Sequence, residues 1–206
     1  MYIAESEGAN RWGMVLQDLR RRGAEDVLVF CTDNLTGFSE AMGDVFPATI
    51  VQKCLVHKVR NSTRFVNDAE LKKVNSGLRA VYTSENLAAA LTAFAAFKVT
   101  WGDKYPMLVE SWERDWEELM AFMDFPQQMR KMIYTTNPVE ALHRIVRKLI
   151  KGKAAWVSDT ALMKQIYLSL MHNEKSWKKN ARGWKAIMRD LIELYGDRIS
   201  KHLPSA

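Results

Sequence analysis

An apolar run that ends in a carboxylate, Val27-Leu28-Val29-Phe30-Cys31-Thr32-Asp33, decides how this chain folds. Its β-branched and aromatic residues predict a short buried strand over 27–31, and the turn that follows leads into a helix that stops near Pro47. Residues 49–52 read as a second short strand, which runs into a helix through about Phe65. Because strands that alternate with helices favour parallel pairing, we expect an α/β core.

Helical periodicity extends the pattern on both sides of this core. Upstream, a helix is predicted from apolar residues that recur every three or four positions and end at a glycine: Trp12, Val15, Leu16, Leu19 and Gly23. Downstream, residues 68–123 show helical spacing only, with helices predicted over 71–81, over 87–98 with Ser84 as its N-cap, and over 108–123. Three tryptophans are expected to pack these helices rather than to form a ligand box: Trp101, Trp112 and Trp116. We therefore expect an all-helical insertion within one helix-rich α/β domain.

Composition is that of an ordinary globular protein. The 206 residues contain 48% hydrophobic and 26% charged residues, enough for one domain with an insertion. No apolar run approaches the roughly 20 residues that span a bilayer, and the first residues lack a signal-peptide pattern. The two cysteines, Cys31 and Cys54, do not indicate a disulfide scaffold. We expect a cytoplasmic protein without membrane contact.

Charge is distributed unevenly along the chain. The net charge is +6, but residues 141–189 hold twelve Lys/Arg and only two acidic residues. Such a basic segment indicates contact with phosphates, and DNA is the partner we expect. A solvated helical surface is the alternative interpretation.

The helix that begins at Asn137 carries the clearest pattern. Asn137 suits the N-cap, Pro138 the first helical position, and Glu140 falls at the third position. At about 100° per residue, one face of this helix is polar and the opposite face is apolar. The polar face holds Glu140, Arg144, Arg147 and Lys151, with His143 at its margin, and the apolar face holds Leu142, Ile145, Val146 and Leu149.

Asp33 and Glu140 are the candidate catalytic carboxylates, since a strand end and a helix start often supply metal ligands for phosphoryl transfer. Each has a structural alternative: Glu140 fits a capping box with Asn137, and Asp33 fits a turn cap. Between them lie Cys54 and His57, at Cys-x-x-His spacing. Two ligands do not make a structural zinc site, which needs four, so a small buried thiol and a helix-surface imidazole are the alternative.

Taken together, these residues resemble bacterial insertion-sequence transposases of the Mutator type. The matching positions run in order along essentially the whole chain: Glu5-Ser6-Glu7-Gly8, Trp12, Leu16, Leu19, Arg22-Gly23, Asp33, Leu35, Gly37-Phe38, Phe46-Pro47, Gln52, Cys54, His57, Arg60-Asn61, Trp101, Tyr105-Pro106, Trp112, Trp116, Tyr134-Thr135-Thr136-Asn137, Glu140, Arg144, Arg147-Lys148, Trp177 and Trp184. One motif shared by accident would not reproduce that order.

The resemblance implies a ribonuclease H-like core with a helical insertion before the last catalytic acid. The resemblance therefore predicts a partial core over residues 1–66 and the helical insertion over residues 67–131. The rest of the core, together with basic helices, is predicted over residues 132–206. Two Asp and one Glu bind Mg²⁺ or Mn²⁺ in that family, and Asp33 would be the second Asp and Glu140 the Glu. Cys54 and His57 match a family signature to which the resemblance assigns no settled role. Five cations would contact DNA: Arg60, Arg144, Arg147, Lys148 and Lys151.

Two positions depart from the family pattern. Asn34 stands where a glycine usually follows the second Asp. The family's first Asp would precede Met1, and Glu5 and Glu7 do not replace it. We therefore expect a truncated transposase that is inactive alone, although the intact family cleaves DNA at element ends and transfers the strand to target DNA. The alternatives are a non-catalytic DNA-binding remnant that forms homo-oligomers or joins and inhibits full-length transposase, and a metal-binding structural module around Cys54.

Overall fold

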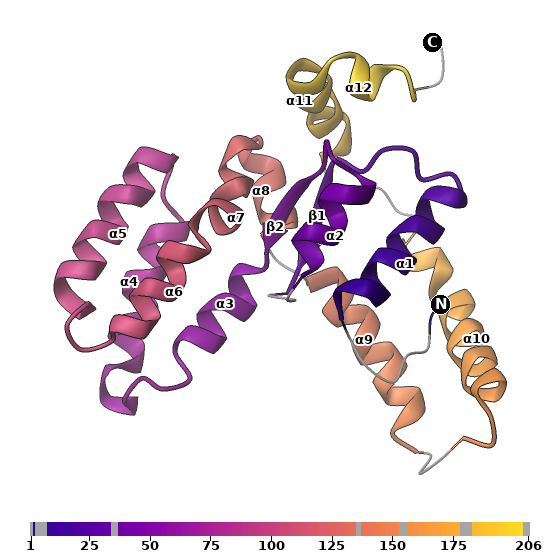
Figure 1. The fold of residues 1–206 in the computed structure, drawn as a ribbon, viewed down its shortest axis with the longest axis horizontal. Coiled ribbons are helices and arrows are strands. Elements are labelled where there is room, and N and C mark those ends of the chain that lie inside the picture. The colour runs from indigo at the N-terminus through magenta and orange to yellow at the C-terminus, as the bar shows by residue number, and fades with distance from the viewer. Residues whose placement is uncertain are drawn as a thin grey trace. The chain divides into compact units, whose positions relative to one another are not determined.

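The computed structural model describes residues 2, 8–33, 37–134, 137–152, 156–177 and 183–203. The chain divides into two compact units. Residues 7–136 form the first, which we call the sheet unit, and residues 1–6 with 137–206 form the second, which we call the C-terminal unit. Figure 1 shows the path of the chain through both.

The sheet unit is built around two parallel strands. β1 (Val29–Thr32) pairs with β2 (Ile50–Lys53), so that Val29 lies opposite Ile50 and Thr32 opposite Lys53. The predicted parallel pairing is confirmed. The predicted bounds are wrong by one or two residues at each end, because the partner strand determines where a ladder starts and stops.

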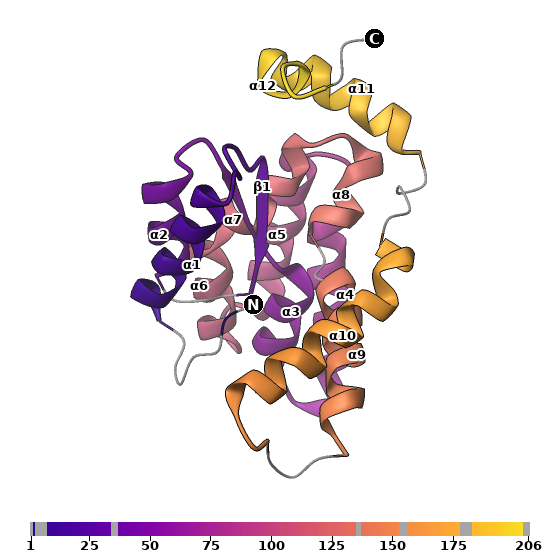
Figure 2. The same cartoon turned by 90° about the vertical axis from the view of Figure 1, so that its right-hand side faces the viewer.

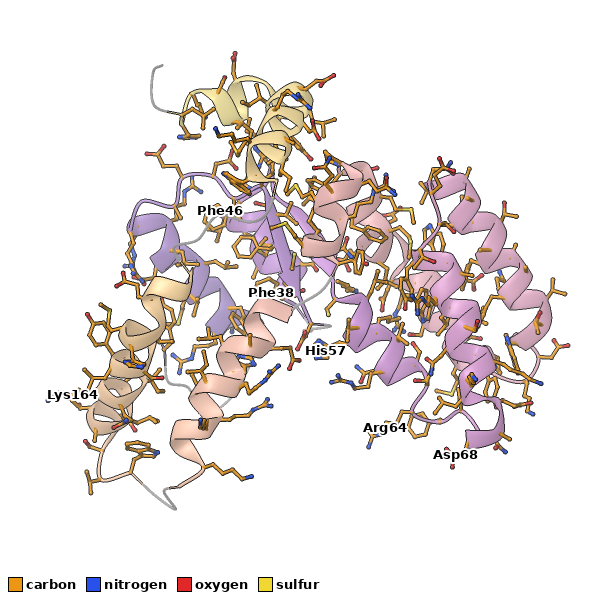
Figure 3. The ribbon with its side chains drawn as sticks, turned by 180° about the vertical axis from the view of Figure 1, so that it is seen from behind. Phe38, Phe46, His57, Arg64, Asp68 and Lys164 are labelled. Carbon is orange, nitrogen blue, oxygen red and sulfur yellow. The ribbon has the colours of Figure 1, made fainter. Side chains whose placement is uncertain are left out.

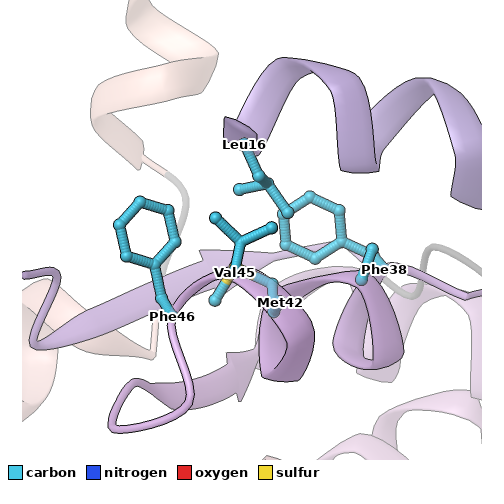
Figure 4. Packing of buried hydrophobic residues seen from close by; sticks show 6 residues of the cluster. Leu16, Phe38, Met42, Val45 and Phe46 are labelled. Carbon is cyan, nitrogen blue, oxygen red and sulfur yellow. The ribbon is translucent and has the colours of Figure 1, made fainter. Parts of the chain in front are cut away.

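α1 (Ala9–Arg21) and α2 (Phe38–Val45) lie together on one side of the strands, as Figures 1 and 2 show. Their buried cluster joins residues of α1, α2 and the turn after α2, each at most 6% exposed: Leu16, Phe38, Met42, Val45 and Phe46 (Figure 4). Burial of each such side chain contributes about 1.5–3 kcal/mol. This cluster holds the helices against the strand that leads to Asp33.

Helices make up the rest of the sheet unit. In chain order they are α3 (Leu55–Ser62), α4 (Asp68–Tyr82), α5 (Leu87–Trp101), α6 (Pro106–Arg114), α7 (Trp116–Met120), the 3₁₀ helix η1 (Ala121–Asp124) and α8 (Gln127–Ile133). Trp112 is fully buried, and Phe94 stacks on both Trp112 and Trp116, with ring centroids 6.2 and 4.9 Å away. The prediction that the tryptophans pack helices is confirmed for Trp112 and Trp116.

Two details of the predicted helices are wrong. The N-cap of α5 is Asn86, whose Oδ1 accepts from Ala89 N–H at 2.9 Å, whereas Ser84 Oγ donates to the Ala80 carbonyl. The helix predicted over 108–123 is broken at Asp115, although its apolar periodicity continues through the break. The break allows the Asp115 carboxylate to reach two lysines of the core, which periodicity alone does not reveal.

The C-terminal unit contains α9 (Asn137–Ile150), α10 (Asp159–Trp177), α11 (Trp184–Tyr195) and α12 (Asp197–Ser200). α9 packs against α10, and α11 against α12. The helix predicted from Asn137 is confirmed, while the Asn137 side chain lies outside the described residues. None of the described helices combines the length and the apolar character needed to cross a membrane. The fold is therefore helix-rich with a small parallel sheet, and the fuller ribonuclease H-like core stays a prediction.

Candidate metal centre at the strand ends

The two strands end side by side, and this places Asp33 next to Cys54. Asp33 directly follows β1, and Cys54 directly follows β2. Cys54 N–H donates to the Thr32 carbonyl at 2.7 Å, which continues the ladder beyond the last strand pair. Parallel strands bring their carboxyl ends to one edge of a sheet, where such folds bind ligands.

His57 joins this pair from the first turn of α3 (Figure 3). Its Nδ1 lies 2.5 Å from Asp33 Oδ1. One ligand atom from each of Asp33, Cys54 and His57 lies within 4.8 Å of the other two. Side-chain exposure is 51% for Asp33 and 20% for His57, while Cys54 is 2% exposed as a residue, so the cluster opens to solvent on the carboxylate side. Sequence spacing alone predicted only the Cys54–His57 pair.

Backbone hydrogen bonds hold the start of α3 in place. Lys58 N–H donates to the Cys54 carbonyl at 2.9 Å, which closes the first helical turn and puts Cys54 and His57 on one face. Leu55 N–H donates to the Tyr134 carbonyl at 3.2 Å, which ties α3 to the end of α8. Hydrogen bonds thus hold the backbone that carries Cys54 and His57, whereas the side chain of Asp33 is exposed.

Cys31 belongs to β1 and forms no disulfide bond with Cys54. Burial, with a smaller contribution from Cys54, raises the pKa of the Cys31 thiol to about 11. At neutral pH this thiol stays protonated and unreactive.

A buried ionic network behind the cluster was missed by sequence reasoning. Lys58 Nζ lies 2.6 Å from the Asp115 carboxylate, and both side chains are 5% exposed. Lys53 Nζ lies 3.0 Å from Asp115 and 2.5 Å from Glu118. Lys58 also donates to the carbonyl and hydroxyl of Ser111, at 2.8 and 2.5 Å. The network fastens α6 and α7 to β2 and α3.

The pKa values in this network follow from burial and pairing. Burial opposes ionisation of Asp115, but hydrogen bonds from Lys58 and Lys53 outweigh it and hold the pKa of Asp115 at about 2. Burial lowers the pKa of Lys58, and the bond to Asp115 offsets part of that effect. Burial also opposes the charge of Lys53, but Glu118 and Asp115 prevail and raise its pKa. Asp115 and Lys53 are thus ionised at neutral pH.

Gln52 makes a second polar connection between β2 and the helices. Its side chain is fully buried, donates to the carbonyls of Leu119 and Lys53 at 2.9 and 2.7 Å, and accepts from Phe122 N–H at 2.6 Å. The signal available in the sequence was a Gln at the end of the predicted second strand, with a Lys directly after it. Such residues need partners, but their identity depends on the fold.

Glu140 and most of the predicted DNA contacts lie in the C-terminal unit. Glu140 is half-buried in the first turn of α9, and Arg144, Arg147 and Lys148 are exposed along that helix. Lys151 is exposed just after α9, and Arg60 is exposed on α3 of the sheet unit. Asp33 belongs to the sheet unit, so the pairing of Asp33 with Glu140 at one metal site stays a prediction.

Comparison with known proteins identifies the family. The family model for Mutator family transposases matches residues 1–180. The chain is 39% identical over 199 residues to the transposase for insertion sequence element ISRM3 of Rhizobium meliloti, which covers 96% of this chain and 50% of that protein. It is 34% identical over 225 residues to a probable insertion-sequence transposase of Corynebacterium diphtheriae, covering 98% of this chain and 65% of that protein. The chain thus spans about half to two thirds of the length of these relatives. The resemblance recognised in the sequence is confirmed, and the chain belongs to the Mutator family of transposases.

Proposed function

We propose that this chain contributes two catalytic carboxylates, Asp33 and Glu140, to a transposase that cleaves DNA at element ends and transfers the strand to target DNA. The observation that carries this proposal is the Asp33 carboxylate at the end of β1, which is half exposed and lies 2.5 Å from His57 Nδ1. The relatives of this chain are described as transposases of insertion sequences. In this proposal β1 and β2 belong to a ribonuclease H-like core, and residues 67–131 form its helical insertion.

The residues fit a divalent cation such as Mg²⁺ or Mn²⁺. An exposed carboxylate at a sheet edge supplies the oxygen ligand that these cations prefer. When bound, such a cation activates an attacking oxygen and stabilises the leaving one. Asp33 would hold it, His57 would orient the Asp33 carboxylate, and Glu140 would complete the oxygen ligands.

The cations named above would neutralise the DNA backbone. Arg144, Arg147 and Lys148 extend along α9 on the C-terminal side of Glu140, and Lys151 follows the helix. Contacts to phosphates are sequence-independent and weaken with salt. They would position DNA for cleavage without reading its sequence.

Metal binding tests the catalytic part of the proposal. Mn²⁺ binding to the purified chain is followed by electron paramagnetic resonance in wild type, Asp33→Asn, Glu140→Gln and the control Asp44→Asn, an exposed acid of α2. We expect each of the first two variants to weaken Mn²⁺ binding at least tenfold and the control to leave it unchanged. Equal affinity in all four proteins would overturn the assignment.

Salt dependence tests the DNA contacts. Fluorescence anisotropy with a labelled duplex gives the slope of log affinity against log salt concentration. Because each phosphate contact contributes about 0.9 to this slope, Arg144→Ala/Arg147→Ala should reduce it by about 2. The matched control is Lys72→Ala/Lys73→Ala, which removes the same charge from exposed positions of α4. An equal change in both double variants would show a net-charge effect and contradict the assigned contacts.

A second candidate function is DNA binding or oligomer formation without chemistry, which would inhibit a full-length transposase. It is favoured by the exposed cations of α9, whose charge does not depend on Asp33. The test is co-expression with the Rhizobium meliloti relative and a marked copy of its element. Excision should fall in the presence of this chain and recover with Arg144→Ala/Arg147→Ala. Unchanged excision would contradict inhibition.

A further inference from the structure

We infer that Asp33, Cys54 and His57 form a three-ligand site for a cation that prefers nitrogen and sulfur, of the Zn²⁺ type. We further infer that this cation, when it is bound, prevents Asp33 from binding Mg²⁺. The second part rests on the proposed function, whereas the site itself rests on the geometry of the sheet unit. The resulting property is inhibition of the metal-dependent chemistry by Zn²⁺.

The donor atoms set the metal preference. The cluster offers one carboxylate oxygen, one thiol sulfur and one imidazole nitrogen. Mg²⁺ takes oxygen ligands almost exclusively, whereas Zn²⁺ and Co²⁺ bind thiolate and imidazole strongly. A buried cysteine directed at an all-oxygen Mg²⁺ site adds nothing to it, but it adds a strong ligand for Zn²⁺. The three donor atoms together therefore favour Zn²⁺ over Mg²⁺.

The geometry needs only a small adjustment. With metal–ligand distances of about 2.0–2.3 Å, tetrahedral coordination separates the ligand atoms by roughly 3.3–3.6 Å. The three atoms lie within 4.8 Å of one another, so separations above 3.6 Å have to shorten by about 1 Å at most, and the 2.5 Å approach of His57 Nδ1 to Asp33 Oδ1 has to open. Asp33 is the exposed member and can swing outward, while the first turn of α3 holds Cys54 and His57.

The arrangement also defines access and coordination number. Cys54 is 2% exposed, so a cation reaches its sulfur from the side of Asp33 and His57. Binding forms a metal–sulfur bond and releases the thiol proton to solvent. Three protein ligands leave one tetrahedral position for water, as in open rather than closed structural zinc sites. Such a site binds metal without being required for folding.

Cobalt provides a direct test on the purified, reduced chain. Titration with Co²⁺ should produce a thiolate-to-cobalt charge-transfer band that saturates at one equivalent. Cys54→Ser should abolish the band, and His57→Asn and Asp33→Asn should each weaken Co²⁺ binding at least tenfold. Cys31→Ser is the matched control, because it removes the chain's other cysteine, and it should keep the band. Circular dichroism confirms that each variant is folded.

Three results would overturn the site: no charge-transfer band in the wild type, a band that persists in Cys54→Ser, or a band that is lost in a folded Cys31→Ser. Because Cys54→Ser nearly keeps the size of the side chain, loss of the band in that variant reports loss of the sulfur ligand rather than loss of packing. The competition is measured by adding Zn²⁺ to the Mn²⁺-loaded chain. One equivalent of Zn²⁺ should displace Mn²⁺ in the wild type but not in Cys54→Ser.

The two experiments separate this inference from the proposed function. A cobalt band without any Mn²⁺ binding at Asp33 would refute the proposed function and the competition, and would support the three-ligand site. Mn²⁺ binding that depends on Asp33, without a cobalt band, would refute the three-ligand site and support the proposed function. Zn²⁺ and Mn²⁺ bound at the same time in the wild type would refute the competition.

Discussion

Removal of the Asp115 carboxylate should destabilise the sheet unit more than loss of any surface ion pair. Asp115 is 5% exposed and accepts from Lys58 and Lys53 at 2.6 and 3.0 Å. Asp115→Ala leaves the Lys58 ammonium, also 5% exposed, without its carboxylate. Breaking a buried pair from one side costs about 3–5 kcal/mol, since the remaining charge stays desolvated.

The pKa of Asp115 gives a second, independent value for the contribution of its carboxylate to the free energy of unfolding. A folded value of about 2 against the ordinary 3.8 corresponds to about 2 kcal/mol of stability at neutral pH. Burial lowers the pKa of Lys58, so the lysine offsets part of this gain. The two routes agree that Asp115→Ala costs a few kcal/mol, a large share of the ~5–15 kcal/mol that stabilises a typical protein.

Urea unfolding, monitored by tryptophan fluorescence, measures how much Asp115→Ala lowers the free energy of unfolding. The control is Glu113→Ala, whose ion pair with Lys98 is nearly half exposed and should contribute below ~1 kcal/mol. If Asp115→Ala does not fold, the double variant Lys58→Met/Asp115→Leu tests the same reasoning, because replacing both charges by apolar groups is often neutral or stabilising. A loss below ~1 kcal/mol for Asp115→Ala, or a double variant less stable than the single one, would refute the argument.

Three further substitutions or conditions should change the stability of the sheet unit. Gln52→Leu removes three hydrogen bonds, two of them fully buried, and leaves Phe122 N–H unpaired, so urea unfolding should show a loss of about 1–3 kcal/mol in the free energy of unfolding. Gly77→Ala brings a Cβ to 2.8 Å from the Phe97 ring and should cost about 1–3 kcal/mol, whereas Gly13→Ala in α1 meets no atom within 4 Å and should stabilise by about 0.5–1 kcal/mol. Because the folded pKa of Asp115 is depressed, its contribution is complete above pH ~4 and is lost as pH falls toward ~2; acid titration of wild type against Asp115→Asn should show a smaller pH dependence in the variant.

Local chemistry was enough to predict the elements that present the candidate site. The β-branched run before Asp33 predicts β1, the Arg20-Arg21-Arg22-Gly23 end predicts the stop of α1, and Asn137-Pro138 predicts the start of α9. These signals depend on backbone propensity and side-chain period, which neighbours in sequence determine. Their bounds shifted by one or two residues wherever a partner strand decided them.

Side chains that meet across the fold could not be predicted in this way. Cys54 and His57 were recognised as a pair from spacing, but the contact of His57 with Asp33 depends on β1 and β2 ending at the same edge. Asp115 appeared to be one residue of a continuous amphipathic helix, and only the packing of α6 and α7 against β2 turned it toward Lys53 and Lys58. Periodicity shows which face is buried but not which buried charges meet.

The sequence by itself determined the family, the parallel strand pair, the helical region after it, and the basic helix that carries Glu140. These follow from motifs and periodicities that are local along the chain. Only the tertiary structure decided that Asp33, Cys54 and His57 converge and that a buried Lys–Asp network holds the helices behind them. The physical reason is that coordination and ion pairing act over a few ångströms, and residues that are 21 or more positions apart come within that range only when the chain folds.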